Sequence, residues 1–297
     1  MRHAAAMLGT MLVLLAGACD APSAGNDGAA AAAAGAADGA QRPEPQRDAP
    51  APATPSADDV LQAIYRIGGQ GRASYDAGDG SEVAFWTGQA FELGGRRYFA
   101  GFAYMTPERF GAEGENAVTE RDDAVAISQA TYALSTEGGA PAWSLASTDG
   151  YVGEFGRNGQ PEAVDDTRAA ERHATRDGRL LLAVPTTGFA NGTALRAYAL
   201  FVFDPDGVAL PRDRPWRYAG SLPAGEDNAA ACDRGAAMPC IANTGTLAFL
   251  PSGGGGLPAV RVTFSGSAIA SPGKTRPLGE ADARTYDYDQ ETARYGP

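Results

Sequence analysis

The amino-acid sequence predicts a mainly β protein with one short N-terminal helix. Short runs rich in β-branched and aromatic residues alternate with Gly, Pro, Asn and Asp turns over most of the chain. Besides the start of the folded part, only residues 168–176 have a helical pattern, and similar hairpin patterns recur along the chain. These observations favour repeated antiparallel hairpins arranged as propeller-like or pseudo-symmetric sheets.

The N-terminus has the organisation of an export signal. Arg2 provides a positive start, residues 7–15 form a short apolar run, and three small residues precede Cys19. This order resembles the bacterial lipoprotein signal, although Leu15 stands four residues before the cysteine instead of the usual three. We therefore expect residues 1–18 to be a lipoprotein signal peptide and Cys19 to carry acyl chains that anchor the protein to a membrane. An ordinary secretory peptide is the alternative.

Residues 19–55 are expected to be a lipid-bearing tether. They are rich in Ala, Gly and Pro and contain almost no large apolar side chain, so they cannot bury enough surface to fold. The Pro-rich end should be extended and semi-rigid. Residues 56–297 are predicted to form a single β-rich domain, within the size range of one large β domain.

The first folded element is predicted to be a helix capped by Ser56. Asp59, three residues later, completes a capping-box pattern, and Gly68 with Gly69 is expected to end the helix. One apolar stripe follows the cap: Val60, Leu61, Ile64 and Ile67. Residues 168–176 also have a helical pattern.

The remaining elements are expected to be strands. The strand-forming runs are 82–86, 97–104, 124–134, 151–155, 180–186, 195–203, 216–222, 246–250, 259–264 and 285–288. The hairpin over 83–108 has a similar pattern to that over 181–206, 98 residues later, and residues 257–265 with 284–289 form a third pair of runs. A meander that reuses glycine turns explains the same pattern without duplication.

Cysteine usage favours one disulfide. If Cys19 carries lipid, Cys232 and Cys240 remain as a pair in an oxidising compartment. A bridge over so short a loop contributes on the order of 2–3 kcal/mol, so its main role is to hold a local loop. Two cysteines without nearby histidine fall short of a structural zinc site.

The charge excludes a nucleic-acid partner. The chain has 24 basic and 36 acidic residues; loss of the signal removes only Arg2, which leaves 23 against 36 and a net charge of −13. Nucleic-acid binding needs clustered Lys and Arg, whereas the only lysine here is Lys274. Such a surface attracts basic proteins instead.

Recognisable catalytic motifs are absent from the sequence. The mature chain has one histidine, His173, which we expect to be exposed, and it has no G-x-S-x-G sequence. Acidic pairs suited to glycoside hydrolysis are plentiful, but none stands out in so acidic a chain. We expect no catalytic residue and no cofactor.

Two oxygen-rich turns are candidate calcium sites. Asp204 and Asp206 precede a glycine, and Asp76, Asp79 and Glu82 form a second cluster. Neither completes a calcium-binding loop, and Asp-Pro-Asp-Gly is also typical of a plain turn. We therefore expect no metal site.

The C-terminal third resembles a group of bacterial periplasmic lipoproteins. The similar segments are Trp216-Arg-Tyr-Ala-Gly, Gly225-Glu-Asp-Asn, the Cys232 and Cys240 pair, Gly245-Thr-Leu-Ala-Phe, Leu257-Pro-Ala-Val-Arg-Val and Tyr286-Asp-Tyr-Asp. Members of this group resemble lysozyme inhibitors and act as immunity proteins against secreted peptidoglycan hydrolases. The resemblance covers roughly the last 80 residues.

The resemblance implies a loop that enters the cleft of a hydrolase. The nearest sequence is Ser147-Thr148-Asp149-Gly150-Tyr151, with Ser147, Asp149, Gly150 and Tyr151 as candidate contacts. This segment has one polar residue more than the Ser-Gly-Tyr-like pattern, and an ordinary Asp-Gly turn is the alternative.

The sequence as a whole predicts an acylated protein on the periplasmic face of the bacterial cell envelope that acts by binding. The preferred partner is a basic cell-wall hydrolase, which the protein would inhibit. The alternatives are an envelope scaffold or assembly lipoprotein and a glycan hydrolase with two carboxylates. Asp20 after Cys19 resembles a retention signal for the inner membrane, but the rule varies between lineages and leaves the inner and outer membranes as alternatives.

Overall fold

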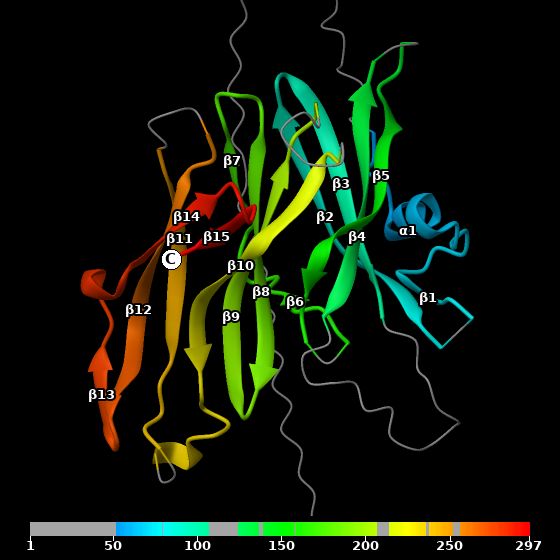
Figure 1. Ribbon diagram of the computed structural model, residues 1–297. Helices are drawn as coiled ribbons and strands as arrows, with labels where there is room; N and C mark the ends of the chain where they lie inside the picture. Colours follow the sequence, from blue (N-terminus) through cyan, green and yellow to red (C-terminus); the bar gives the residue numbers. More distant parts are fainter. Residues whose placement is uncertain are drawn as a thin grey trace, which may run out of the picture. The chain divides into compact units, whose positions relative to one another are not determined.

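Three antiparallel sheets and one α-helix make up the described part of the chain (Figure 1). The computed structural model describes residues 52–78, 80–106, 124–136, 139–157, 159–206, 214–235, 238–251 and 256–297. The mainly β class predicted from the sequence is confirmed. No described helix has the length and apolar character that crossing a membrane requires.

Each sheet is built from strands that follow one another closely in the sequence. The first sheet has the order β1(Ser74–Asp76), β2(Glu82–Leu93), β3(Arg96–Met105), β4(Val125–Ser135), β5(Ala142–Phe155). The central sheet has the order β10(Trp216–Asp227), β9(Thr193–Phe203), β8(Leu180–Ala190), β6(Ala163–Val164), with β7(Glu171–Ala174) also paired to β8. The third sheet has the order β11(Asn243–Leu250), β12(Ala259–Ser271), β14(Arg284–Asp289), β15(Arg294–Gly296), with β13(Lys274–Pro277) on β12. Two short 3₁₀ helices complete the described elements: η1(Asp233–Gly235) and η2(Glu280–Asp282).

Helix α1(Ala57–Tyr65) forms where its capping signal predicts. Ser56 Oγ accepts the backbone N–H of Asp59 at 3.2 Å, and Asp59 Oδ2 accepts the backbone N–H of Ser56 at 2.8 Å. The helix ends at Tyr65, two residues before the predicted end, because Arg66 adopts a left-handed conformation with φ 63°. Its apolar side packs on the first sheet, where a Cβ at Gly101 would lie 2.3 Å from Val60 Cγ2. The glycine therefore sets how closely the helix approaches β3.

The predicted helix over residues 168–176 is wrong. Glu171–Ala174 form strand β7, whose residues pair with Leu180–Ala183 of β8. Arg168 stays outside the strand because its guanidinium is held by Asp165 at 2.7 Å and by the carbonyl of Thr186 at 3.0 Å. Tertiary pairing with β8 overrides a weak local helical preference.

The central sheet is buried on both faces. In β8, Leu180 and Leu182 face the core shared with the first sheet, whereas Leu181 faces the core shared with the third sheet, and all three are at most 2% exposed. In β9, residues 198–203 are all buried in the same alternating way. Strands that are covered on both sides read as continuous apolar runs, which explains the sequences LLLAV and YALFVF.

The order of layers is helix α1, first sheet, central sheet and third sheet, as Figure 1 shows. The core between the first and central sheets is aromatic: the Phe102 ring lies 4.8 Å from the Phe201 ring and 5.0 Å from the Trp216 ring, centroid to centroid. The hairpins that look alike in the sequence, β2–β3 and β8–β9, lie in adjacent layers, and the third pair of runs forms β12 and β14. Stacked layers do not confirm the propeller-like arrangement.

Because β8 is buried on both faces, neighbouring leucines on this strand should contribute similarly to the stability of the fold. We expect Leu181→Ala and Leu182→Ala each to lower the free energy of unfolding by about 2–5 kcal/mol, because each leaves a cavity in a different core. Leu145→Ala, at a side chain that is 52% exposed, should change it by about 0.5 kcal/mol or less. Urea unfolding measures all three variants. Tolerance of either buried substitution would contradict the double-sided burial of β8.

Candidate protein-binding surface on strand β5

The segment proposed as a protruding loop lies inside strand β5. Ser147 pairs with Thr131 of β4, and Asp149 pairs with Gln129. Both the predicted loop and the alternative Asp-Gly turn are therefore wrong for this segment. The sequence Asp-Gly suggested a chain reversal, but the pairing with β4 keeps the backbone extended.

A β-bulge replaces the expected turn. The register between β4 and β5 shifts between Ile127 and Gln129, which pair with Gly153 and Asp149, so that residues 150–152 of β5 stand opposite Ser128 alone. Ser128 fills this position and donates from Oγ to the carbonyl of Gly150 at 2.9 Å. Bulges of this kind bend a strand and redirect its side chains. Here the bulge lies on the last strand of the first sheet.

Asp149, Tyr151 and Arg214 form the centre of the candidate surface. Arg214 Nε lies 3.3 Å from Asp149 Oδ2, and its Nη1 donates to the carbonyl of Tyr151. The same guanidinium lies over the Tyr151 ring, 5.8 Å from its centroid. Asp149 Oδ1 also accepts the backbone N–H of Tyr151 at 2.9 Å. These contacts fix a charged pair and an aromatic ring side by side.

Tyr151 keeps a large part of its ring in solvent. It is 42% exposed, and Leu145 of the same strand is 52% exposed. Burial, followed by the charge and hydrogen bonding of Glu154, raises the pKa of the Tyr151 phenol. The phenol is therefore neutral at physiological pH and presents both an apolar ring and a hydroxyl. Exposed tyrosine held in a fixed position is typical of protein-binding surfaces.

A chain of buried polar groups holds β5 in place. Trp216 Nε1 donates to Thr131 Oγ1 at 2.8 Å, Thr131 donates to Gln129 Oε1 at 2.7 Å, and Gln129 Nε2 donates to Ser147 Oγ at 3.4 Å. Thr131 and Gln129 are at most 1% exposed. Because buried polar groups are costly when unpaired, this chain fixes one register for the edge strand. The polar sequence Ser-Gln-Ala-Thr inside an apolar run was the signal for it.

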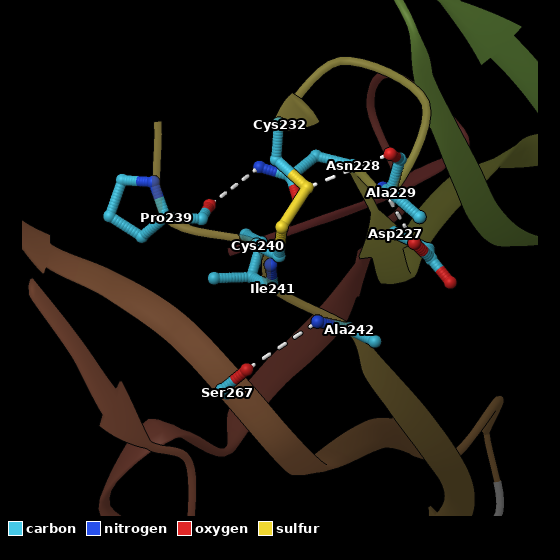
Figure 2. Close-up of a disulfide and its surroundings, with 9 residues drawn as sticks. All are labelled: Asp227, Asn228, Ala229, Cys232, Pro239, Cys240, Ile241, Ala242 and Ser267. Atoms are coloured by element: carbon cyan, nitrogen blue, oxygen red, sulfur yellow. Dashed lines mark hydrogen bonds between the residues drawn. A yellow bond between two sulfur atoms is a disulfide. The ribbon is translucent and has the colours of Figure 1, made fainter. Parts of the chain in front are cut away.

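The predicted disulfide is present. Cys232 and Cys240 are bridged in a loop between β10 and β11, with Cα atoms 5.1 Å apart. Asn228, which is 3% exposed, closes this loop from inside: its Nδ2 donates to the carbonyl of Pro239 at 3.0 Å, and its Oδ1 accepts the N–H of Ile241 at 2.8 Å (Figure 2). The bridge and the amide together fix the start of β11.

The other predicted positions show no convergent site. Asp204 Oδ1 accepts the N–H of Asp206 at 3.1 Å, which makes a plain turn at the end of β9. In the second cluster, Asp76 Oδ1 accepts the N–H of Gly78 at 2.7 Å, and Asp79 lies outside the described residues. Among the residues that the structure describes, no three His, Cys, Asp or Glu side chains are grouped to hold a metal ion.

His173 and Cys19 complete the account of the predicted positions. His173 is half-buried on β7 with its ring 5.3 Å from that of Phe249, so the expectation of an exposed imidazole is wrong. Cys19, with the signal peptide and most of the tether, lies outside the described residues. The sequence did not indicate Arg214, whose role depends on its contact with a strand more than 60 residues away.

No protein-family model matches this chain, and no curated protein or solved structure is significantly similar to it.

The disulfide should contribute stability in proportion to the short loop it closes. We expect Cys232→Ala with Cys240→Ala to lower the free energy of unfolding by about 2–3 kcal/mol, because the bridge restricts the unfolded chain. Urea unfolding of the oxidised chain and of the double variant gives the difference. If addition of a thiol reductant destabilises the double variant as much as the oxidised chain, the bridge is not the cause.

Proposed function

We propose that this protein is a lipid-anchored binding protein of the bacterial cell envelope that inhibits a cell-wall hydrolase. The observation that carries the proposal is the contact of Arg214, from the segment before β10, with Asp149 and Tyr151 of the edge strand β5. It joins an aromatic anchor to a charged pair, the combination on which tight protein interfaces depend.

The charge of the chain supports a basic partner. The full chain carries −12, and loss of the signal makes it −13. Such a field accelerates the encounter with a cationic protein, whereas the side chains on β5 decide whether contact persists. A basic peptidoglycan hydrolase with acidic catalytic groups fits both requirements, since Arg214 would meet its carboxylates.

The envelope location is proposed from two independent features. The signal-like N-terminus ends at Cys19, and the bridge between Cys232 and Cys240 is of the kind that persists in oxidising compartments. Acyl chains on Cys19 would hold the domain at the membrane through the tether.

Lipidation can be tested directly. We expect mass spectrometry of the protein from bacterial membranes to find Cys19 as the first residue, carrying acyl chains. Cys19→Ser should move the protein from the membrane to the soluble fraction. An unmodified thiol at Cys19, or membrane retention of the Ser variant, would contradict the anchor.

Inhibition is tested with the full chain in mild detergent against a panel of basic muramidases acting on peptidoglycan. We expect saturable inhibition by the wild type and loss of roughly tenfold or more in potency for Tyr151→Ala, because the anchor ring is removed. Phe189→Ala, at a 69% exposed ring on the central sheet, is the matched control and should keep full potency.

Three outcomes separate the alternatives. Equal potency of Tyr151→Ala and wild type would remove β5 from the interface. Unchanged lysis with constitutive binding to a membrane complex would favour the envelope scaffold. Release of glycan fragments by the purified chain alone would show a hydrolase and overturn the proposal.

A further inference from the structure

A cavity of about 520 Å³ lies between the central and third sheets. Four arginines line it and come from four separate segments: Arg157 from the turn after β5, Arg196 from β9, Arg276 from β13 and Arg284 from β14. The volume falls in the range of ordinary small-molecule sites. Four guanidinium groups therefore line one cavity of a protein that is acidic overall.

Most of these guanidinium groups have no carboxylate partner. Arg276 is paired with Asp282, with Nη2–Oδ1 at 2.6 Å and Nη1–Oδ2 at 3.0 Å. Within the described residues, no ion pair involves Arg157, Arg196 or Arg284. Their donors therefore remain available to an anion that enters the cavity.

The charge of the lining is positive although the whole chain carries −12. The carboxylates of the lining are Glu162, Glu226 and Asp282, three against four arginines, which leaves +1. Asp282 is committed to Arg276: the hydrogen bonds from that guanidinium, with one from the N–H of Gly279, lower its pKa to about 2. An excess of one positive charge favours a monoanion over a highly charged ligand.

The floor of the cavity is rigid and fixes Arg196. Gly225 has φ +132°, and a Cβ there would lie 2.4 Å from the carbonyl oxygen of Asn243, so β10 and β11 touch through their backbones. The buried Asn243 amide joins Glu226 N–H to the carbonyl of Ser267, at 3.1 and 3.0 Å. Arg196 Nη1 donates to the Asn243 carbonyl at 3.1 Å, which leaves its remaining donors in place for a ligand.

The walls add a flat apolar surface and hydrogen-bond acceptors. Phe264 and Leu195 line the cavity, and Arg284 lies over the Phe264 ring at 5.9 Å. Glu162 also lines the cavity; the Thr186 hydroxyl donates to its Oε2 at 2.8 Å, and the Trp86 indole donates to its backbone carbonyl at 2.9 Å. A hydroxylated ring with one carboxylate matches this lining. Its carboxylate would accept hydrogen bonds from the arginines, its hydroxyls would donate to the glutamates, and one face of the ring would pack on Phe264.

We infer that this cavity binds an acidic sugar, a hydroxylated ring that carries one carboxylate, through Arg196, Arg284 and Arg157. This inference does not depend on inhibition of a hydrolase, because the cavity and the β5 surface share no described residue. Paired guanidinium donors recognise a planar carboxylate, and acceptor carboxylates orient the hydroxyls.

The test is a ligand-observed NMR titration of the full chain in mild detergent with D-glucuronate as the probe. D-glucose serves as the uncharged control sugar of the same ring size, and inorganic phosphate serves as the control anion. We expect saturable binding of glucuronate, binding of glucose weaker by about tenfold or more, and weaker binding of phosphate. Arg196→Gln and Arg284→Gln should each lower the affinity for glucuronate by about tenfold, because each removes a charge-assisted hydrogen bond.

The control is Arg97→Gln, which removes the same charge from an exposed position on β3 and should leave binding unchanged. Circular dichroism shows whether each variant is folded. Arg284 is exposed, so its substitution should not unfold the protein, and Arg284→Gln tests the site if Arg196→Gln is unfolded. Absence of saturable glucuronate binding, or unchanged binding in Arg284→Gln, would overturn the site. Phosphate binding tighter than glucuronate, or glucose binding equal to it, would overturn the acidic-sugar class.

Discussion

The burial of the central sheet on both faces is the constraint on which the rest of the structure depends. Strands β8 and β9 expose almost nothing between Leu180 and Val184 or between Tyr198 and Phe203, so each needs a partner layer on either side. The first sheet supplies one cover and the third sheet supplies the other. Removal of either layer would leave a continuous apolar face in water, and for this reason the three sheets must fold as one cooperative unit.

The two candidate surfaces follow from this arrangement. The first sheet has only one face on the central sheet, and its last strand, β5, presents Tyr151, over whose ring Arg214 from the segment before β10 lies. A cavity lies between the third and central sheets, and four arginine side chains are among the residues that line it. In both places charged groups stand at the edge of a rigid core, which is where binding residues gain the most from fixed geometry.

Sequence reasoning found what local physics determines. The capping box at Ser56, the β class and the bridge between Cys232 and Cys240 all follow from short-range signals. It failed where distant residues decide: β7 is a strand only because β8 offers it an edge, and Asp149-Gly150 is a bulge only because Ser128 fills the gap. The roles of Arg214 and of the four arginines that line the cavity could not be predicted from the sequence, because they depend on contacts between segments far apart in the chain.

The bulge in β5 limits what can pair with the edge of the first sheet. A long, regular, exposed edge would invite any extended peptide to add to the sheet, including a second copy of this chain. The shift of register at Ile127 and the inward-held Asp149 interrupt that backbone template. On the proposed binding surface, side chains of defined shape and charge would therefore determine selectivity, and the bulge disfavours edge-to-edge pairing with another strand.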